Sequence, residues 1–477
     1  MVRRGERVHL IGLAGSGAAG AALLIAADGA VVDGCDADGP SPYTPPLEAA
    51  GIRLITGHDP VHLEDVERVV ITPALRAVPD HAEMAAARAR GIPVETWQRL
   101  LGEMMATPPR LGLAVTGTHG KSTTTAPLGH LLVAAGRDPT VEVGAYIEAW
   151  GASVRRGGGE VFLVEADEWG DNFLNYRPSA AIVTNIEMDH PDYFADLEAM
   201  DRSYERFLTG MRPDPRVGGR LLLAAADDAG INRLLRRLGD WEGRVIHYGP
   251  GGQVAASDVE YRQSGTTFRL FERMFEMQLA GEHNVRNATA ALTLSRELGV
   301  PLEALAAGLR SFSGAGRRLE LIGEHGGVTV FDDYAHHPTE VRAAIAAARQ
   351  RVGGRRLWAV FEPHMYSRTR LLFDEFAGSF TAADEVVIVD IFASRDADTS
   401  ITSAAELADA VERTSAVPTI ATGDSEESAR YVAEHLRSGD AVLVMGAGRS
   451  YRVAREITRL LEAGILTSAT TGGGFGA

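Results

Sequence analysis

Lysine and cysteine are almost missing from this 477-residue sequence. Cys35 is the only cysteine, so no disulfide can form within the chain, which suits a reducing compartment. Lys121 is the only lysine, and arginine supplies all other side-chain cations apart from histidine. The net charge of -17 also means that the chain lacks the positive surface needed to bind nucleic acid or an anionic membrane unspecifically. We therefore expect neither polyanion as a partner, and a local cluster must hold any anionic ligand.

Long apolar runs are missing as well. Residues 1–30 begin with arginines and continue with small apolar residues, as a secretory signal does, but Glu6 and His9 interrupt the run. No other stretch is long and apolar enough to span a bilayer. The sequence thus predicts a cytoplasmic protein without membrane contact, and we expect a monomer or a weak homodimer.

Length and composition predict several globular domains. Apolar residues make up 45% and charged residues 23%, as in ordinary folded proteins, and a single core rarely grows past roughly 250 to 300 residues. Strand-like and helix-like segments alternate in three α/β units, which we place at residues 1–107, 108–316 and 317–466. The predicted linkers are 105–112, which contains two prolines, and 313–318, which contains two glycines. The tail, 467–477, is predicted to be disordered.

The three units differ in detail. In the first, a glycine turn follows the strand RVHLIGL and opens a helix, as in Rossmann-like domains. The second reads as a mainly parallel sheet around the lysine, except that residues 254–281 alternate with period two and predict antiparallel hairpins at the sheet edge. In the third unit, strand-like and helix-like segments again alternate as in a Rossmann-like domain.

The string VTGTHGKST, residues 115–123, places the only lysine on a glycine-flanked turn between a predicted strand and a helix from about Ser122 to Ala135. Backbone N–H groups and the helix N-terminus converge there and favour an anion. Val115 stands where a GxxxxGK[ST] phosphate loop has its first glycine, so the motif alone also fits a solvated helix start. A compact ammonium can sit between phosphate oxygens where a planar guanidinium needs a different loop. The retained lysine therefore favours a phosphate loop.

Acidic residues end two further predicted strands, in VEADE (164–168) and TNIEMDH (184–190). In an open parallel sheet both ends face the same crevice as the lysine loop. Glu165 and His190 are therefore candidate Mg2+ ligands, and the supporting carboxylates would be Asp167, Glu168, Asp189 and Asp192. Each stretch by itself could be an ordinary solvated loop, but together with a phosphate loop they favour a magnesium–nucleotide site.

Six strings occur in the order GTHGKST, EADE, TNIEMDH, GEHNVRNATAA, GAGRRLE and DDYAHHPTE. On these strings the chain resembles the Mur ligase family across all three units. HLIGLAGSGAAG, the GCDA strand end and the GH at 57–58 are similar to the members that use UDP-N-acetylmuramate and L-alanine. The resemblance implies a Rossmann-like UDP-binding domain, a P-loop-type ATPase domain and a Rossmann-like domain that binds the amino acid.

The resemblance also implies an activity and a set of residues. The activity is ATP-dependent joining of L-alanine to the carboxylate of UDP-N-acetylmuramate, through an acyl phosphate, in peptidoglycan precursor synthesis. Residues implied for catalysis are Lys121, Glu165, His190, His336 and Arg368. Those implied for ATP are Gly117, Thr118, His119, Gly120, Lys121, Ser122, Thr123, His283, Asn284, Asn287, Arg318 and Asp333. Those implied for the other substrates are Gly15, Ser16, Gly17, Asp36, His58, Tyr334, His336 and Arg368, and those for Mg2+ are Ser122, Glu165 and His190. Without the resemblance, His336 could simply belong to a capped loop, and Asn284 could be an ordinary N-cap.

The chain departs from the family pattern at several positions. Many members carry a carbamoylated lysine after the DH motif, which this chain cannot have, and helical spacing suggests that Asp201 supplies a carboxylate to the metal instead. The alternative is that Asp201 is a solvated surface residue. Further departures are Trp169, Gly170, Met365 and Arg449, which lie on the expected substrate side.

Three other functions stay open. A recycling ligase of the same family would join a ready-made tripeptide to UDP-N-acetylmuramate. A nicotinamide-dependent oxidoreductase is suggested by GLAGSG with Asp36 at ribose-binding distance, although the spacing is GxxGxG. A silent nucleotide-binding paralogue would bind ATP without turnover.

The single lysine gives a direct prediction. Because a guanidinium cannot take the place of a point-like ammonium in this loop, Lys121→Arg should lower ATP-dependent turnover by about 100-fold or more. Steady-state ADP release measures the effect, and an equally active variant would contradict the phosphate-loop interpretation.

Overall fold

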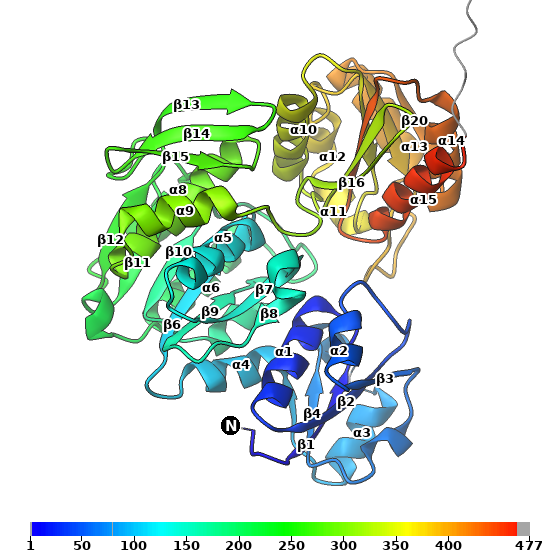
Figure 1. Cartoon of the computed structure of the whole chain (residues 1–477). Coiled ribbons are helices and arrows are strands. Elements are labelled where there is room, and N and C mark those ends of the chain that lie inside the picture. The colour runs from blue at the N-terminus through cyan, green and yellow to red at the C-terminus, as the bar shows by residue number, and fades with distance from the viewer. Residues whose placement is uncertain (1, 79, 465–477) are drawn as a thin grey trace, which may run out of the picture.

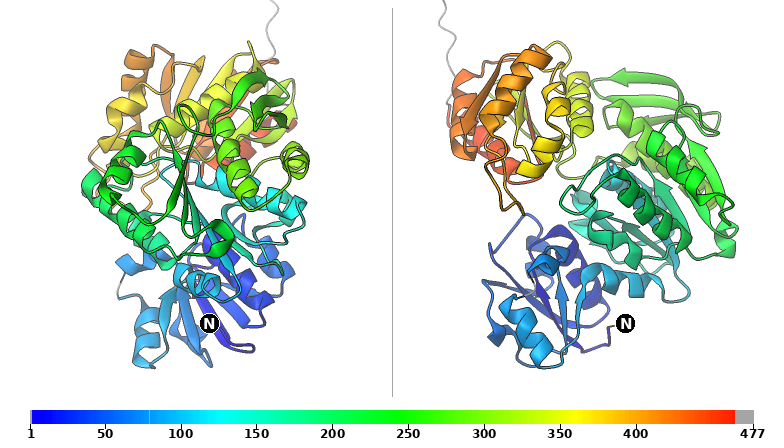
Figure 2. Two further views of the ribbon diagram at one scale, coloured as in Figure 1. Left: turned by 90° about the vertical axis from the view of Figure 1, so that its left-hand side faces the viewer. Right: turned by 180° about the vertical axis from the view of Figure 1, so that it is seen from behind.

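The structure, a computed structural model, describes residues 2–78 and 80–464. Three α/β units follow one another along the chain, each built on its own mainly parallel sheet, which confirms the predicted fold class (Figure 1). Seen from behind, the third unit lies above the first, and the middle unit lies beside both (Figure 2). The predicted tail, 467–477, lies outside the described residues. Within the described ranges, no helix has both the length and the apolar character needed to cross a membrane.

The first unit holds a five-stranded parallel sheet in the order β3-β2-β1-β4-β5. Its strands are β1 (Arg7–Ile11), β2 (Val31–Asp36), β3 (Arg53–Thr56), β4 (Arg68–Ile71) and β5 (Val94–Thr96). Its helices are α1 (Ser16–Ala27), α2 (Pro45–Ala49), α3 (Ala82–Ala89) and α4 (Trp97–Met105), with the 3-10 turns η1 (Pro60–Leu63) and η2 (Pro73–Ala77). Strand order reverses beside β1, so the loops after β1 and β4 border a crevice of the kind that binds nucleotides.

The middle unit holds a seven-stranded sheet in the order β12-β11-β10-β6-β9-β7-β8, in which only β8 is antiparallel. Its strands are β6 (Leu111–Thr116), β7 (Thr140–Ile147), β8 (Ala152–Arg155), β9 (Val161–Glu165), β10 (Ala180–Val183), β11 (Leu221–Ala225) and β12 (Arg244–Tyr248). Its helices are α5 (Lys121–Ala134), α6 (Leu197–Thr209), α7 (Ala229–Leu238), α8 (Glu282–Glu297) and α9 (Leu302–Ser311), with η3 (Glu148–Trp150), η4 (Trp169–Asn175) and η5 (Pro215–Val217). Every residue of β6, β10 and β11 is buried, as expected of central parallel strands covered on both faces.

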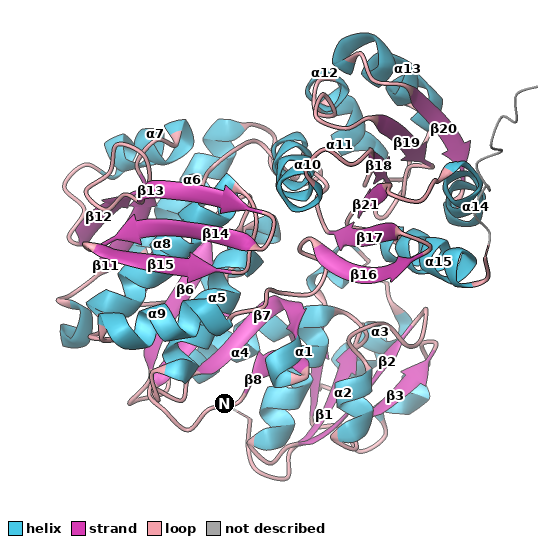
Figure 3. Cartoon of the chain, turned by 45° about the horizontal axis from the view of Figure 1, so that its top comes forward, coloured by secondary structure: helices cyan, strands magenta, loops and turns pink. Residues whose placement is uncertain are grey.

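Residues 254–281 fold differently from the prediction in one respect. They are antiparallel, but β13 (Ser257–Arg262), β14 (Gly265–Leu270) and β15 (Arg273–Met277) form a separate sheet instead of extending the edge of the large one (Figure 3). Period-two alternation buries one face, where Phe268 and Phe275 stack, and this face packs against α8 and α9. The apolar face of this separate sheet thus covers α8 and α9. Strands that extended the large sheet beyond its edge strand β12 could not cover these helices.

The third unit holds a six-stranded sheet in the order β16-β17-β21-β18-β19-β20, antiparallel only between β16 and β17. Its strands are β16 (Glu320–His325), β17 (Val328–Asp333), β18 (Leu357–Phe361), β19 (Glu385–Val389), β20 (Thr419–Gly423) and β21 (Ala441–Met445). Its helices are α10 (Pro338–Val352), α11 (Tyr366–Leu371), α12 (Phe373–Ala377), α13 (Ala404–Ser415), α14 (Ser425–His435) and α15 (Ser450–Glu462). Separate apolar clusters fill its two faces.

The units are joined in two different ways. One apolar core continues from the first unit into the middle unit, where α1 packs on β7 and β8 and a side chain at Gly20 would collide with Val154. The core clusters of the third unit contain only its own residues, and this unit contacts the others largely through charged side chains.

The predicted boundaries at 107/108 and 316/317 fall in the stretches between α4 and β6 and between α9 and β16. Those boundaries stay predictions.

Asp201 has neither of the two roles that the sequence suggested. It lies on the buried face of α6, is 1% exposed, and accepts hydrogen bonds from Arg233 Nε and Nη2 of α7 at 2.5 and 2.9 Å. The expectation of a metal-binding carboxylate is therefore wrong, because the guanidinium occupies both oxygens. The alternative of a solvated surface residue is also wrong, because α6 turns this position toward α7.

This pair predicts a stability effect without an effect on metal use. Asp201→Asn leaves Arg233 without its carboxylate and should destabilise the middle unit by about 1 to 3 kcal/mol, while the Mg2+ dependence of turnover stays unchanged. Differential scanning calorimetry measures the first effect and a Mg2+ titration the second. Glu205→Gln, at an exposed pair on the same helix, is the matched control and should change little. A shifted Mg2+ dependence in Asp201→Asn would contradict this assignment.

Candidate active site

The loop between β6 and α5 has the conformation of an anion-binding turn. Gly117 (φ +136°) and Gly120 (φ +77°) both lie in the region that favours glycine, and Gly120 is the N-cap residue of α5. A side chain at Gly117 would collide with Thr184, and one at Gly120 would press on Asn287. Both glycines are therefore required by the loop itself, which confirms the predicted strand–turn–helix arrangement around Lys121.

Lys121 lies at the start of α5 among oxygen atoms, and its side chain is 13% exposed. Its Nζ donates to the carbonyls of Gly117 (2.7 Å) and Thr118 (3.2 Å) and to Glu168 Oε2 (2.8 Å). Burial alone lowers the pKa of Lys121, but the Glu168 and Asp167 carboxylates outweigh it and raise the pKa above its ordinary value. The ammonium is thus charged at every physiological pH and is held at the mouth of the loop.

The expected metal ligands lie around this ammonium, but not in the expected grouping. Glu165 accepts hydrogen bonds from Ser122 Oγ (3.0 Å) and from the backbone N–H of Gly144 (2.7 Å). His190 Nε2 lies 3.5 Å from Glu168 Oε1, and His190 with Asp167 and Glu168 forms a group that could hold a metal ion. Sequence reasoning gave Glu168 only a supporting part, whereas it contacts both Lys121 and His190.

The donor set fits a divalent cation. Glu168 Oε1 is buried and has no hydrogen-bond partner among the described residues, an arrangement that is costly unless something else satisfies the oxygen. The hydroxyl and carboxylates at this point, Ser122, Glu165, Asp167 and Glu168, are hard oxygen ligands of the kind that Mg2+ prefers. These residues could hold Mg2+ beside phosphates bound at the loop.

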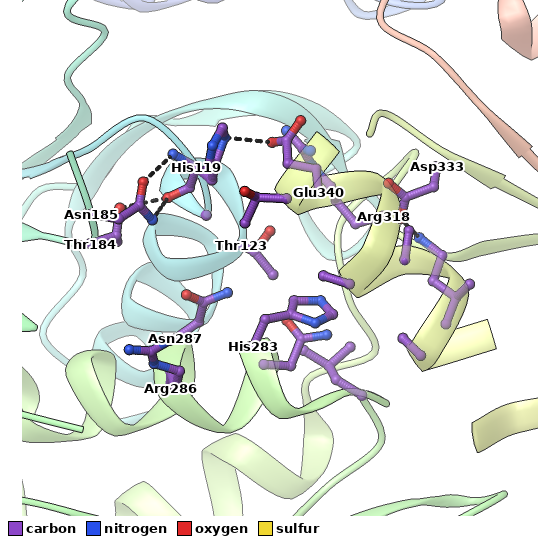
Figure 4. Close-up of a pocket in the computed structure, with 18 of the residues that line it drawn as sticks. His119, Thr123, Thr184, Asn185, His283, Arg286, Asn287, Arg318, Asp333 and Glu340 are labelled. Atoms are coloured by element: carbon purple, nitrogen blue, oxygen red, sulfur yellow. Dashed lines mark hydrogen bonds and ion pairs between the residues drawn. The ribbon is translucent and has the colours of Figure 1, made fainter. Parts of the chain in front are cut away.

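A pocket next to the loop brings together eight of the residues expected to bind ATP (Figure 4). It is lined by residues of α5, α8 and α10 and by the segments after β10 and before β16. The eight are His119, Gly120, Thr123, His283, Asn284, Asn287, Arg318 and Asp333. Burial lowers the pKa of His283 to about 4, so its ring is neutral at pH 7 and can face a nucleobase without charge. Gly117, Thr118, Lys121 and Ser122 are not among the residues that line this pocket and lie around the loop and its carboxylates.

Several residues that line this pocket were not predicted. Asn185 clamps the loop, accepting from the His119 N–H (2.8 Å) and donating to the His119 carbonyl (3.0 Å). Arg286 and Glu340 belong to strings that carried the family resemblance, so their positions were available in the sequence. Tyr248 and Phe312 come from the last strand and helix end of the middle unit and had no sequence signal that pointed to them.

Two arginines bring the third unit onto the middle unit. Arg318 Nη2 donates to Ser122 Oγ (3.1 Å), and Arg368 Nε donates to Asp189 Oδ1 (2.7 Å) in a pair whose side chains are both 2% exposed. Arg368 Nη2 also lies 3.5 Å from His190 Nδ1. The arrangement brings together the phosphate loop, the carboxylates and the third unit.

His336 and Tyr334 lie beside this junction. Burial lowers the pKa of His336 to about 4, so the imidazole is neutral at pH 7. Its Nδ1 is 3.0 Å from the Tyr334 carbonyl, which can only accept, so Nδ1 carries the proton and Nε2 keeps its lone pair. The Tyr334 ring packs under the guanidinium groups of Arg317 and Arg318.

In the first unit, the glycine turn after β1 is fixed by Asp36. The Ala14 N–H donates to Asp36 Oδ2 (3.0 Å), and Gly15 is the N-cap residue that precedes Ser16 at the start of α1. Gly17 faces Trp97, whose ring would collide with any side chain there, so its smallness serves helix packing. His58 turns toward Cys35 and Glu83, at 3.2 and 3.3 Å.

Two of the departures from the family pattern, Trp169 and Met365, lie close together at the junction of the middle and third units. The Trp169 Nε1–H donates to Asp192 (2.9 Å), and Arg395 both pairs with Asp192 and lies over the Trp169 ring. Arg395 Nη2 is also 3.6 Å from the sulfur of Met365. A guanidinium thus lies beside Met365, one of the positions that depart from the family pattern. Arg449 instead points at Asp38 of the first unit, 3.8 Å away.

A buried histidine links the middle and third units by charge. His119 lies 3.5 Å from Glu187 and 3.5 Å from Glu340, and its ring is 4.3 Å from that of His337. Burial opposes ionisation of His119, but the two glutamates raise its pKa to about 9, while burial and the charged neighbour lower the pKa of His337 to about 3. At pH 7 one ring is therefore cationic and the other neutral.

The ionisation of His119 predicts how docking of the units depends on pH. Because its pKa is raised in the folded state, its contribution is fully present below about pH 6.5 and is lost as the pH rises through about 9. We expect the radius of gyration, measured by small-angle scattering, to increase over this range. His119→Gln should remove the step, and His325→Gln, within the third unit, should keep it. A step that persists in His119→Gln would contradict this cause.

Three family models match the chain in succession. They are the Mur ligase family catalytic domain at residues 7–108, the Mur ligase middle domain at 115–295 and the Mur ligase glutamate ligase domain at 317–448. These ranges correspond to the three units described above.

Relatives of known name match over almost the whole chain. The chain is 40% identical to a UDP-N-acetylmuramate–L-alanine ligase of Kineococcus radiotolerans, covering 96% of this chain and 97% of the relative. It is 39% identical to a ligase of the same name from Mycolicibacterium vanbaalenii, with the same coverage. Among solved structures, a UDP-N-acetylmuramate–alanine ligase of Thermotoga maritima superimposes with a TM-score of 0.81 at 24% identity, covering 96% of this chain and 99% of that one. A murein peptide ligase of Psychrobacter arcticus gives 0.70 at 25%, with the same coverage.

Proposed function

Since the chain belongs to the Mur ligase family, we propose that it is an ATP-dependent ligase that joins L-alanine to the carboxylate of UDP-N-acetylmuramate. The product is an amide, formed in peptidoglycan precursor synthesis. The observation that carries the proposal is the phosphate loop with its single lysine, facing arginines of the third unit, in a chain whose full-length relatives bear this name. The nicotinamide-dependent alternative gives no role to Lys121, Glu168 or His190.

Charge is the first problem that this reaction poses, because ATP and a carboxylate repel each other. Lys121 and Arg318 are cations from two units that meet at Ser122, and both can contact phosphate oxygens. With ATP bound, we expect the Lys121 ammonium to exchange Glu168 for phosphate oxygens. When bound, Mg2+ held by Ser122, Glu165, Glu168 and His190 would neutralise further phosphate charge.

The chemistry has two transfers. A carboxylate oxygen of UDP-N-acetylmuramate attacks the γ-phosphorus, ADP leaves, and an acyl phosphate forms. The amine of L-alanine then attacks the acyl carbon, inorganic phosphate leaves, and one proton is lost from nitrogen. His336 is neutral and keeps the lone pair of Nε2, so we propose that it accepts this proton, while Arg368 and Tyr334 orient the amino acid.

The first unit would hold the nucleotide end of the other substrate. Gly15 and Ser16 begin α1, whose backbone N–H groups can receive a pyrophosphate, and Asp36 supports the turn. His58 lies at the same end of the sheet. We also propose that the protein acts in the cytoplasm as a monomer or a weak homodimer.

The decisive experiment is a coupled ADP-release assay with ATP, Mg2+ and UDP-N-acetylmuramate, given L-alanine, glycine, L-serine or a cell-wall tripeptide in turn. We expect the highest kcat/KM with L-alanine and no release without UDP-N-acetylmuramate. A preference for the tripeptide would instead identify the recycling ligase, and ATP binding without turnover would identify a silent paralogue.

Arg368→Lys should raise the KM for L-alanine by about 10-fold or more, since the planar guanidinium with its two parallel N–H donors is lost.

A further inference from the structure

The first unit contains a cluster of metal-binding side chains that the ligase reaction does not use. His9 of β1, Cys35 of β2, His62 of η1 and Glu83 of α3 each offer one ligand atom, and these four atoms all lie within 4.8 Å of one another. His9, Cys35 and Glu83 are fully buried, and the His62 side chain is 13% exposed. Four separate elements thus direct an imidazole, a thiol, an imidazole and a carboxylate at one point.

The three distances among His9, Cys35 and Glu83 match a tetrahedral site. His9 Nε2 is 3.4 Å from Cys35 Sγ and 3.7 Å from Glu83 Oε1, and Sγ is 3.4 Å from the same oxygen. Zinc bonds of about 2.0 to 2.3 Å place tetrahedral ligands roughly 3.3 to 3.8 Å apart. His62 Nδ1 is closer to Glu83, at 2.7 Å, which is a hydrogen bond, so a bound ion would push these two atoms apart.

His9 is also oriented as a metal ligand. Its Nδ1 lies 2.7 Å from Asp33 Oδ1, so the carboxylate can hold the ring and leave Nε2 directed at Cys35 and Glu83. Histidines that bind metals usually donate their other N–H in this way. His9 is fully buried on a central strand. Packing alone would favour an apolar residue at this position.

Further ligands surround the four. His58 Nδ1 is 3.2 Å from Cys35 Sγ, and His58, His81 and Glu83 form a second group that could hold a metal. The Nδ1 atom of His81 is buried and finds no hydrogen-bond partner in the part of the chain that the structure describes. The partly exposed side of the cluster is therefore also lined with imidazoles, which gives an ion a path from solvent.

We propose that this cluster is a zinc site formed by His9, Cys35, His62 and Glu83, separate from the nucleotide site. A thiolate and a carboxylate together neutralise the two charges of the ion, and two neutral imidazoles complete the tetrahedron. Mixed nitrogen, sulfur and oxygen ligands suit zinc and do not suit Mg2+. Binding releases the thiol proton and any imidazole protons to solvent.

The site would act as a staple within the first unit. It ties the outer elements η1 and α3 to the central strands β1 and β2. Cys35 immediately precedes Asp36, which fixes the glycine turn of the proposed UDP site. Four protein ligands close the coordination sphere, which is typical of structural zinc rather than of catalytic zinc.

Cobalt substitution tests the proposal, because Cys35 is the only thiol in the chain. With Mg2+ omitted, one equivalent of Co2+ should give a thiolate-to-cobalt charge-transfer band and the visible bands of a tetrahedral site, and Zn2+ should displace them. The folded chain should retain about one zinc per molecule after dialysis, measured by atomic emission. Zinc should also raise the thermal midpoint of the first unit.

Variants separate a metal site from a hydrogen-bonded cluster. Cys35→Ser should abolish the charge-transfer band, and His62→Gln should weaken Co2+ binding by about 10-fold or more while circular dichroism shows a folded chain. His435→Gln, at an exposed histidine in the third unit, is the matched control and should bind normally. Absence of a thiolate band in the unaltered chain, or equal Co2+ affinity in His62→Gln, would overturn the proposal. Neither result depends on ligase turnover, so the proposed function is tested independently.

Discussion

The contact between the Lys121 ammonium and the Glu168 carboxylate is the interaction on which the site depends. It holds a partly buried cation at the start of a helix, where backbone N–H groups already favour an anion. Glu168 in turn reaches His190, and Asp189 next to it is buried against Arg368 of another unit. A single chain of alternating charges therefore runs from the phosphate loop into the third unit.

This chain of charges explains why the units are joined so differently. The first and middle units share a continuous apolar core, so separating them would expose apolar side chains to water at a cost in free energy. The third unit instead rests on ion pairs and hydrogen bonds such as Arg318 to Ser122, whose groups water can solvate when they separate. The proposed ligase must admit three substrates and then exclude water from an acyl phosphate, and a polar interface on a rigid base permits both.

The sequence predicted the arrangement of elements better than the partners of individual side chains. Unbroken apolar strands, the glycine turns and the two linker segments all had local signals, and the expected ATP residues His283, Asn287 and Arg318 do line one pocket. Contacts between side chains that are far apart in the sequence had no local signal. Asp201 looked like a metal ligand by helical spacing, but only the packing of α6 on α7 reveals Arg233 beside it. Likewise the sequence assigned Cys35 no role beyond excluding a disulfide, because His9, His62 and Glu83 are far apart along the chain and meet around it only in the fold.

The stacking of Arg395 over Trp169 joins the third unit to the middle unit at a ring-to-guanidinium distance of 4.5 Å. The indole has a guanidinium over its ring only while the two units are together, so its fluorescence records whether they are. The chain has five tryptophans, and this one lies where the middle and third units meet. The protein thus carries an intrinsic optical reporter of the contact between these two units, readable without any attached dye.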